Sequence, residues 1–256
     1  AVEAVSFELK KAIQQAAANI DKFHRAQKTK KVYQETTPGV VCWQEKRPIE
    51  KVGLYIPGGT APLLSTVLML AIPAKIAGCQ EIVLCSPPNF EGKIANEILY
   101  TANLCGVNNI FKVGGIQAIS GLTFGTATIP KVYKIFGPGN QFVTVAKQLA
   151  TKYGVAIDMP AGPSELLVMA DDSANASFVA SDLLSQAEHG ADSQVLLVST
   201  SEKLIEDVSK EVEKQLKKLP RIEIATKAIQ ISKSILVNDF KEALALINEY
   251  APEHFI

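Results

Sequence analysis

From Gly53 onward, short apolar segments alternate with longer amphipathic ones, and several of the changes fall at a glycine. The short segments have the length and side chains of strands, whereas the longer ones carry apolar residues at helical spacing. Strands that alternate with helices form βαβ units, in which helices cover a parallel sheet. We therefore expect helices between a series of strands near residues 81–88, 110–115, 131–139, 165–171, 193–200 and 234–238.

The Pro/Gly-rich segment DMPAGPSE, residues 158–165, separates two such sets and is typical of a seam between structural units. An amphipathic helix at residues 1–24 and a polar segment of strand-forming residues precede the first set. The pattern predicts an α/β fold of two Rossmann-like units with parallel βαβ sheets, the second inserted into the first. We expect residues 1–54 and 164–256 in the first unit and residues 55–163 in the inserted one.

The charge balance is neutral, with 26 basic and 26 acidic residues, so no basic field is present to hold nucleic acid. The longest apolar run, residues 61–78, contains Pro73 and Lys75 and is too short and interrupted to span a bilayer. The cysteines show no C-x-x-C spacing, which indicates free thiols in a reducing compartment. We expect a cytoplasmic protein that binds a small molecule, with neither a nucleic acid nor a membrane as partner.

Glycine-rich turns follow three of the expected strands, at residues 55–62, 113–119 and 136–143. In a doubly wound sheet the carboxyl ends of the strands bind ligands, and a helix N-terminus favours a phosphate. However, GPGNQF is not the dinucleotide fingerprint, because Phe142 occupies the position of the third glycine. The turns are compatible both with a nucleotide site and with ordinary punctuation of an α/β fold.

Gln186 and His189 stand three residues apart in LLSQAEHG, so on a helix that runs to Gly190 they share one face. An amide oxygen and an imidazole nitrogen are able to bind zinc, although two ligands are too few for a closed site. The alternative is a histidine that interacts with the negative end of the helix dipole.

Glu253 and His254 are adjacent in YAPEHFI, after Pro252, which favours an extended Ala251. A histidine and a carboxylate in one pocket are able to move two protons, so the pair is a candidate acid–base site. The alternative is a surface turn with two polar residues. For His24 and Cys79 we expect a structural or exposed histidine and a buried, inert thiol.

Several long motifs together resemble the histidinol dehydrogenase family: VGLYIPGGTAPLLSTVLMLAIPAKIAGCQEIVLCSPP, VGGIQAI, KIFGPGNQFVT, AIDMPAGPSELLV, SDLLSQAEHGADSQ and APEHFI. The resemblance runs over essentially the whole chain. It implies oxidation of L-histidinol to L-histidine through L-histidinaldehyde, the last step of histidine biosynthesis, with two NAD⁺ used in succession and one zinc ion per site.

The resemblance also implies roles for individual residues. Tyr55, Gln117 and Asn140 match the family's NAD contacts, which makes the inserted unit the NAD-contacting one. The positions that match substrate contacts are Ser164, Gln186, His189 and His254. Gln186 and His189 match zinc ligands as well, and Glu253 and His254 match the catalytic acid–base pair.

At its ends the chain departs from the family pattern. Family members have a further N-terminal segment and a C-terminal region whose aspartate and histidine complete the zinc site, the histidine coming from the partner of a homodimer. We therefore expect the remaining zinc ligands outside this chain. Two alternatives stay open: an aldehyde dehydrogenase-like enzyme with a Cys79 nucleophile, and a truncated nucleotide-binding α/β module without activity.

Overall fold

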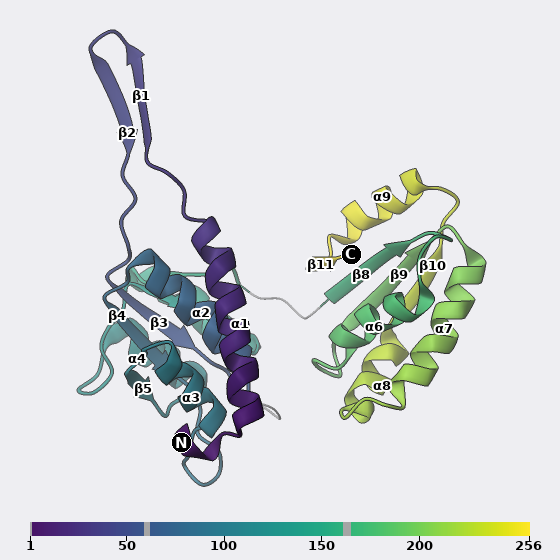
Figure 1. The fold of residues 1–256 in the computed structure, drawn as a ribbon, viewed down its shortest axis with the longest axis horizontal. Helices are drawn as coiled ribbons and strands as arrows, with labels where there is room; N and C mark the ends of the chain where they lie inside the picture. The colour runs from purple at the N-terminus through teal and green to yellow at the C-terminus, as the bar shows by residue number, and fades with distance from the viewer. Residues whose placement is uncertain (1, 59–61, 161–164) are drawn as a thin grey trace. The chain divides into compact units, whose positions relative to one another are not determined.

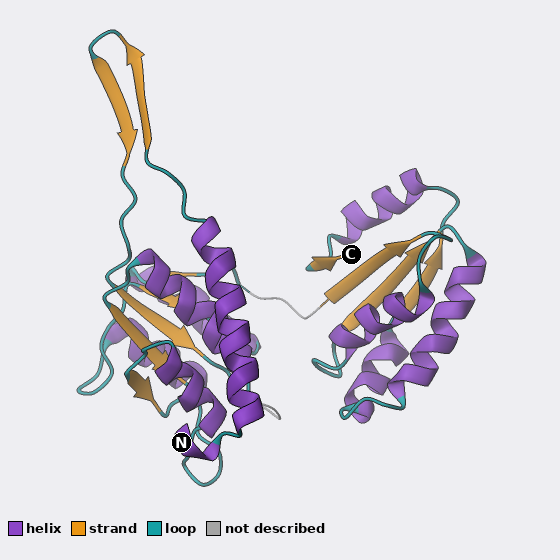
Figure 2. Ribbon diagram, in the orientation of Figure 1, coloured by secondary structure: helices purple, strands orange, loops and turns teal. Residues whose placement is uncertain are grey.

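The computed structural model describes residues 2–58, 62–160 and 165–256. The contacts within it divide the chain into two compact units, Ala1–Ala161 and Gly162–Ile256. Each unit contains one parallel sheet packed against helices, as Figures 1 and 2 show. This architecture confirms the expected α/β class.

The first unit is built on a five-stranded parallel sheet in the order β5-β4-β3-β6-β7. From β3, the chain builds the sheet outward in one direction through β4 and β5, and then in the other through β6 and β7. The carboxyl ends of β3 and β6 therefore flank the point where the strand order reverses, which is where doubly wound sheets bind ligands. The strands are β3 (Lys51–Tyr55), β4 (Glu81–Cys85), β5 (Asn109–Phe111), β6 (Lys134–Phe136) and β7 (Ala156–Ile157).

Helices cover both faces of this sheet because successive strand residues point to opposite sides. Val52 and Leu54 of β3 pack with α1 (Phe7–Ala26), α2 (Leu64–Ala77) and α3 (Asn96–Leu104) in one core. Tyr55 of the same strand belongs to a second core with α4 (Gly115–Phe124) and α5 (Gln141–Ala150). Short 3₁₀ turns, Val2–Ala4 and Thr151–Tyr153, complete the helical elements of this unit.

Residues 1–54 belong to the first unit, together with residues 55–161. We expected them instead to form a discontinuous domain with residues 164–256. Ile13 of α1 is 1% exposed and lies in the core formed with α2 and α3. β3 pairs on both sides, with β4 and with β6, and so belongs to the centre of this sheet. The grouping differs from the expectation because the apolar side of α1 and the edges of β3 are covered within the first unit.

Between α1 and β3 the chain forms an antiparallel hairpin, β1 (Val32–Thr37) and β2 (Val40–Gln44). Gly39 in its turn has φ +85°, a conformation that glycine adopts without steric cost. The side chains of both strands are exposed except that of Val41, which is half-buried.

The second unit has a four-stranded parallel sheet in the order β10-β9-β8-β11. Helices α6 (Ala176–Ala187), α7 (Glu202–Leu216) and α8 (Ile222–Ile231) cover one face, and α9 (Phe240–Tyr250) packs on the other. The strands are β8 (Glu165–Ala170), β9 (Gln194–Ser199), β10 (Lys233–Leu236) and β11 (His254–Phe255). Only one helix was expected between β9 and β10, at residues 202–219, so α8 is an additional helix that was not predicted.

Among the described residues, no helix is both long and apolar enough to cross a membrane.

Candidate functional site

A cleft of about 550 Å³ opens at the carboxyl edge of the first unit's sheet. The loops that follow β3 and β4 line it together with the start of α4 and the residue that caps α5. The lining residues are Tyr55, Pro57, Gly58, Pro62, Leu63, Ser86, Pro87, Pro88, Asn89, Lys93, Ala95, Ile98, Gly115 and Asn140.

Tyr55 and Asn140, far apart in the sequence, meet at this cleft. The Tyr55 side chain is 4% exposed, and its hydroxyl accepts a hydrogen bond from the backbone N–H of Gly115 at 3.1 Å. Asn140 is the N-cap of α5, where its Oδ1 accepts from the N–H of Val143 at 3.1 Å. The cleft thus combines an aromatic wall with the N-terminal ends of α4 and α5, which favour negatively charged groups.

Glycines bring the loops at this edge into close contact. A Cβ at Gly137 would overlap the carbonyl oxygen of Tyr55, and Gly137 has φ +126°, so no other residue fits there without strain. Cβ atoms at Gly58 and Gly114 would both overlap the ring of Pro87, which lies between them. The glycine turns therefore serve close backbone approach even though the fingerprint G-x-G-x-x-G is absent.

Gln117, the third expected NAD contact, does not line the cleft. Its side chain is exposed on the first turn of α4. A Cβ at Gly115 would lie 3.0 Å from its Oε1, so the amide is adjacent to a residue that does line the cleft.

The loop after β4 was not predicted as part of a site, yet it contributes Ser86, Pro87, Asn89 and Lys93 to the cleft. The signal was the run of prolines and an asparagine directly after an apolar strand. Asn89 orders the loop, since its Oδ1 accepts from the N–H groups of Glu91 and Lys93 at 3.0 and 2.9 Å.

In the second unit, Gln186 and His189 lie at the C-terminal end of α6. Gln186 is 6% exposed, whereas His189 is exposed. The helix ends at Ala187, so the expectation that both residues share a helical face is wrong for His189. The chain leaves the helix in a tight turn, in which the N–H of His189 donates to the carbonyl of Gln186 at 3.1 Å.

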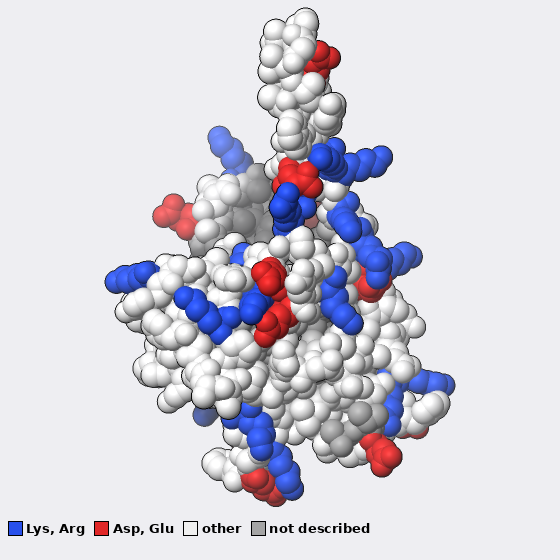
Figure 3. Space-filling model, turned by 90° about the vertical axis from the view of Figure 1, so that its left-hand side faces the viewer, with Lys and Arg blue, Asp and Glu red and all other residues white. Residues whose placement is uncertain are grey.

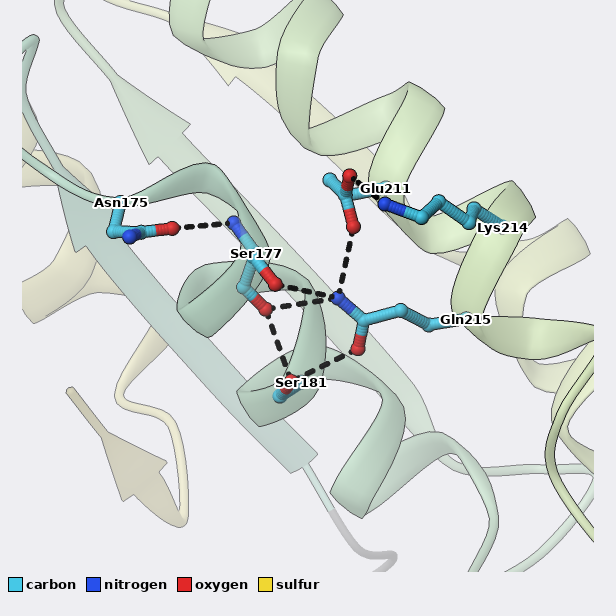
Figure 4. Close-up of polar contacts among 6 residues, drawn as sticks. All are labelled: Asn175, Ser177, Ser181, Glu211, Lys214 and Gln215. Atoms are coloured by element: carbon cyan, nitrogen blue, oxygen red, sulfur yellow. Dashed lines mark hydrogen bonds and ion pairs between the residues drawn. The ribbon is translucent and has the colours of Figure 1, made fainter.

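A polar network ties α6 to α7 at the other end of the helix (Figure 4). The amide nitrogen of Gln215 donates to the carbonyl and hydroxyl oxygens of Ser177 at 2.9 and 3.2 Å. The hydroxyl of Ser181 donates to Gln215 Oε1 at 2.9 Å. Together with the apolar contacts of its buried face, this network fixes the helix that carries Gln186.

Glu253 lies in the connection between α9 and β11, His254 is the first residue of β11, and both side chains are exposed. The residue before Pro252 is not extended as we expected: Ala251 has φ +50° and ψ +60°. In this left-handed conformation its N–H closes the helix by donating to the carbonyl of Ile247 at 2.8 Å.

These residues of the second unit lie at the amino edge of its sheet. His254 pairs with Leu166 near the start of β8, and α6 ends just before β9 begins. At the same edge the Tyr250 hydroxyl donates to Gln194 Oε1 at 2.8 Å, and burial, with a smaller effect of the Glu165 charge, raises the pKa of Tyr250.

The described residues do not form a complete metal site. They contain no group of three or more His, Cys, Asp or Glu side chains arranged to hold an ion. Gln186 and His189 alone do not satisfy the four-coordinate preference of zinc. Ser164, the remaining expected substrate contact, lies outside the described residues.

Cys79 and His24 lie away from the cleft. Cys79 precedes β4, at the sheet edge opposite the cleft, and burial raises the pKa of its thiol. A protonated thiol is a poor nucleophile. His24 is exposed in the last turn of α1, where its Nδ1 lies 2.7 Å from Gln27 Oε1.

Acidic and basic side chains are interspersed on the face of the molecule that Figure 3 shows, consistent with the neutral composition.

Comparison with known proteins assigns this chain to a family. The model of the histidinol dehydrogenase family matches residues 1–256. A histidinol dehydrogenase from Bacteroides thetaiotaomicron is 63% identical over 252 residues, which cover 98% of this chain and 59% of the relative. The chain therefore spans about three fifths of the length of that relative.

Solved structures agree with the sequence comparison. The crystal structure of histidinol dehydrogenase from Elizabethkingia anophelis matches with a TM-score of 0.96 and 60% identity, over 99% of this chain and 59% of that one. An NAD-dependent aldehyde dehydrogenase from Sinorhizobium meliloti matches with a TM-score of 0.55 and 16% identity, over 81% of this chain and 42% of that one. The second likeness shows a shared fold only. Because the family model matches from the first residue to the last, this chain belongs to the histidinol dehydrogenase family.

Proposed function

We propose that the protein containing this chain oxidises L-histidinol through L-histidinaldehyde to L-histidine, with NAD⁺ as the oxidant. The assignment is supported by membership of the histidinol dehydrogenase family. The structural observation that carries it is the meeting of Tyr55 and Asn140 at one cleft, at the point where the strand order reverses.

Tyr55, Asn140 and Gln117 are the proposed NAD⁺ contacts. The starts of α4 and α5 lie at the cleft of about 550 Å³, where the positive ends of the helix dipoles favour a pyrophosphate. Gln117 is proposed as a contact at the rim, because its amide lies beside Gly115. When bound, NAD⁺ would supply the hydride acceptor, and two NAD⁺ used in succession would take one hydride each.

Ser164, Gln186, His189 and His254 are the proposed substrate contacts. His254 takes the proton of the alcohol as the first hydride leaves, which gives the aldehyde. Glu253 takes a proton from water as the oxygen adds to the aldehyde carbon, and the protonated His254 gives its proton to the carbonyl oxygen, which yields the hydrate. His254, neutral again, then takes a hydroxyl proton of the hydrate as the second hydride leaves, and the acid formed releases its remaining proton to solvent to give the carboxylate. Exposure of both side chains leaves them free to exchange protons with solvent between steps.

We propose Gln186 and His189 as two of the ligands of a zinc ion that positions the substrate. The described residues supply no cluster that would complete its coordination, so none of the steps above depends on the ion. The further ligands are proposed to lie outside this chain, with the working protein a cytoplasmic homodimer.

The runner-up function, an aldehyde dehydrogenase with a Cys79 nucleophile, is disfavoured by position and protonation. Cys79 lies at the amino edge of β4, away from the cleft, and its partly buried thiol has a raised pKa.

Calorimetric titration of the chain with NAD⁺ tests the cleft assignment. We expect saturable binding that Asn140→Ala weakens roughly tenfold, since it loses both the α5 cap and a ligand contact. The matched control is Asn108→Ala, an exposed asparagine just before β5, at the opposite sheet edge. Equal affinities of the two variants, or no binding by the wild type, would reject the assignment.

The substrate is tested by histidinol-dependent NADH formation, followed at 340 nm in the protein that contains this chain. Reduction of NAD⁺ by simple aldehydes but not by L-histidinol would instead support the runner-up, and loss of that activity on alkylation of Cys79 would establish it.

A further inference from the structure

Lys147 lies on the buried face of α5. Val143, Lys147 and Ala150 are the buried residues of this helix, at the spacing of one helical face. The Lys147 side chain is only 5% exposed. A buried ammonium is costly unless it is paired and hydrogen-bonded, so its partners indicate what it does.

Lys147 has two partners, the carbonyl oxygen of Gly137 and the carboxylate of Asp158, and Asp158 in turn accepts a hydrogen bond from the N–H of Gly137. The Nζ of Lys147 donates to the carbonyl oxygen of Gly137 at 2.6 Å and forms an ion pair with Oδ1 of Asp158. The other carboxylate oxygen of Asp158 accepts from the N–H of Gly137 at 2.7 Å. The ion pair therefore holds both backbone polar groups of one glycine.

Gly137 is the point where the turn after β6 meets β3. It packs so closely on the backbone of Tyr55 that a Cβ would overlap the Tyr55 carbonyl oxygen. The same turn ends at Asn140, the cap of α5 and part of the cleft. A shift of Gly137 would therefore move the backbones that carry both Tyr55 and Asn140.

The pair also links separate elements at this edge. Lys147 belongs to α5, and Asp158 follows β7, where its own N–H donates to the carbonyl of Ile135 in β6 at 3.2 Å. Contacts from a helix and from a neighbouring strand end thus fix the turn from two directions.

We propose that Lys147 and Asp158 are positioning residues for NAD⁺ binding, which act by holding Gly137 so that Tyr55 and Asn140 face the cleft together. The inference rests on the proposed function, because that function makes NAD⁺ the ligand of the cleft. Neither side chain contacts the ligand in this proposal.

Three variants of the 256-residue chain test the proposal. Lys147→Met removes the charge and both donated bonds at similar side-chain length. Asp158→Asn keeps an oxygen for the N–H of Gly137 and weakens only the ion pair. Lys152→Met is the matched control, because Lys152 is exposed and lies just beyond the same helix.

The measurements are the Kd for NAD⁺ by calorimetry at 25 °C, the thermal unfolding temperature, and the amide NMR signals of Gly137 and Asn140. We expect the Kd to rise roughly tenfold in Lys147→Met and about threefold in Asp158→Asn, because misplaced contacts lose binding energy. It should stay unchanged in Lys152→Met. Both amide signals should shift in the first two variants and not in the control.

A fold-stabilising role alone would lower the unfolding temperature of Lys147→Met while its Kd stays within twofold of the wild type, and this result would overturn the proposal. If Lys147→Met does not fold, Asp158→Asn decides: a wild-type Kd would overturn the proposal as well. Absence of NAD⁺ binding by the wild type would instead overturn the proposed function and, with it, this inference.

Discussion

The two sheets of this chain present their candidate residues at opposite edges. In the first unit, Tyr55 and Asn140 lie at the carboxyl edge, where loops lead into the N-termini of α4 and α5. In the second, Gln186, His189 and His254 lie at the amino edge, where α6 and α9 end.

The two edges differ in the electrostatic environment that they offer to a ligand. Helix N-termini carry partial positive charge and free N–H groups, which suit the phosphates of a dinucleotide. Helix C-termini carry partial negative charge and free carbonyl groups, which suit an amine, an imidazolium or a metal ion. The edges therefore match the two ligands that we propose, NAD⁺ and histidinol.

The largest effect is expected from Gly137→Ala, which forces a Cβ against the Tyr55 carbonyl at a positive φ. The first unit should lose about 3 kcal/mol or more of unfolding free energy, from backbone strain together with overlap. The control is Gly154→Ala, which has a positive φ but open space around its Cβ and should cost about 1 kcal/mol.

Thiol labelling during urea unfolding measures this effect in the first unit alone. All the cysteines belong to this unit, and burial raises the pKa of the Cys85 thiol to about 12, so Cys85 stays unreactive until the sheet opens. If the two glycine variants expose Cys85 at the same urea concentration, the close contact at the carboxyl edge is not a source of stability.

Next in size is Glu253→Gln at the amino edge of the second unit. In the protein that contains this chain, oxidation of supplied L-histidinaldehyde should slow by roughly 100-fold, since general-base catalysis is worth about that much. The first hydride transfer from L-histidinol should fall far less. Single-turnover NADH formation with each substrate measures both, and Glu249→Gln, an exposed glutamate on α9, is the control. Equal losses in both steps would show that Glu253 does not activate water.

Tyr55→Phe should have a smaller effect, confined to the carboxyl edge of the first unit. It removes the acceptor of the Gly115 N–H, a loss of about 1 kcal/mol, so the Kd for NAD⁺ should rise about fivefold. Zinc content, measured by atomic absorption, should not change, and Tyr33→Phe on the exposed hairpin should change neither quantity. Loss of metal with unaltered NAD⁺ affinity would show that the two edges are assigned the wrong way round.

The smallest effect is expected from zinc itself. With an amide and one imidazole from this chain, bound zinc should stabilise the second unit by less than about 1 kcal/mol, and His189→Ala should abolish that gain. Urea unfolding with and without Zn²⁺, followed by hydrogen exchange in α6 and by Cys85 labelling, separates the two units. Stoichiometric zinc that survives dialysis against a mild chelator would mean that the chain supplies more ligands than Gln186 and His189.

Much of the fold was predictable because it follows from local periodicity. The alternation of strands and helices after Gly53 predicted parallel sheets, and parallel strands necessarily bring the turns after β3, β5 and β6 to one edge. Helix α8 was not predicted. It lies between two predicted elements, and no side-chain cap marks its start.

The sequence by itself determined which residues follow which strands, and its long motifs pointed to the family. The tertiary structure decided what surrounds them. It left Gln117 exposed beside Gly115 and outside the cleft lining, ended α6 at Ala187 and put Cys79 at the edge opposite the cleft. It also paired Lys147 with Asp158 around Gly137, contacts that join helix α5 to the segments that follow β6 and β7. Periodicity records only which face of its own element a residue occupies, whereas burial and hydrogen bonding depend on what other elements bring to that face.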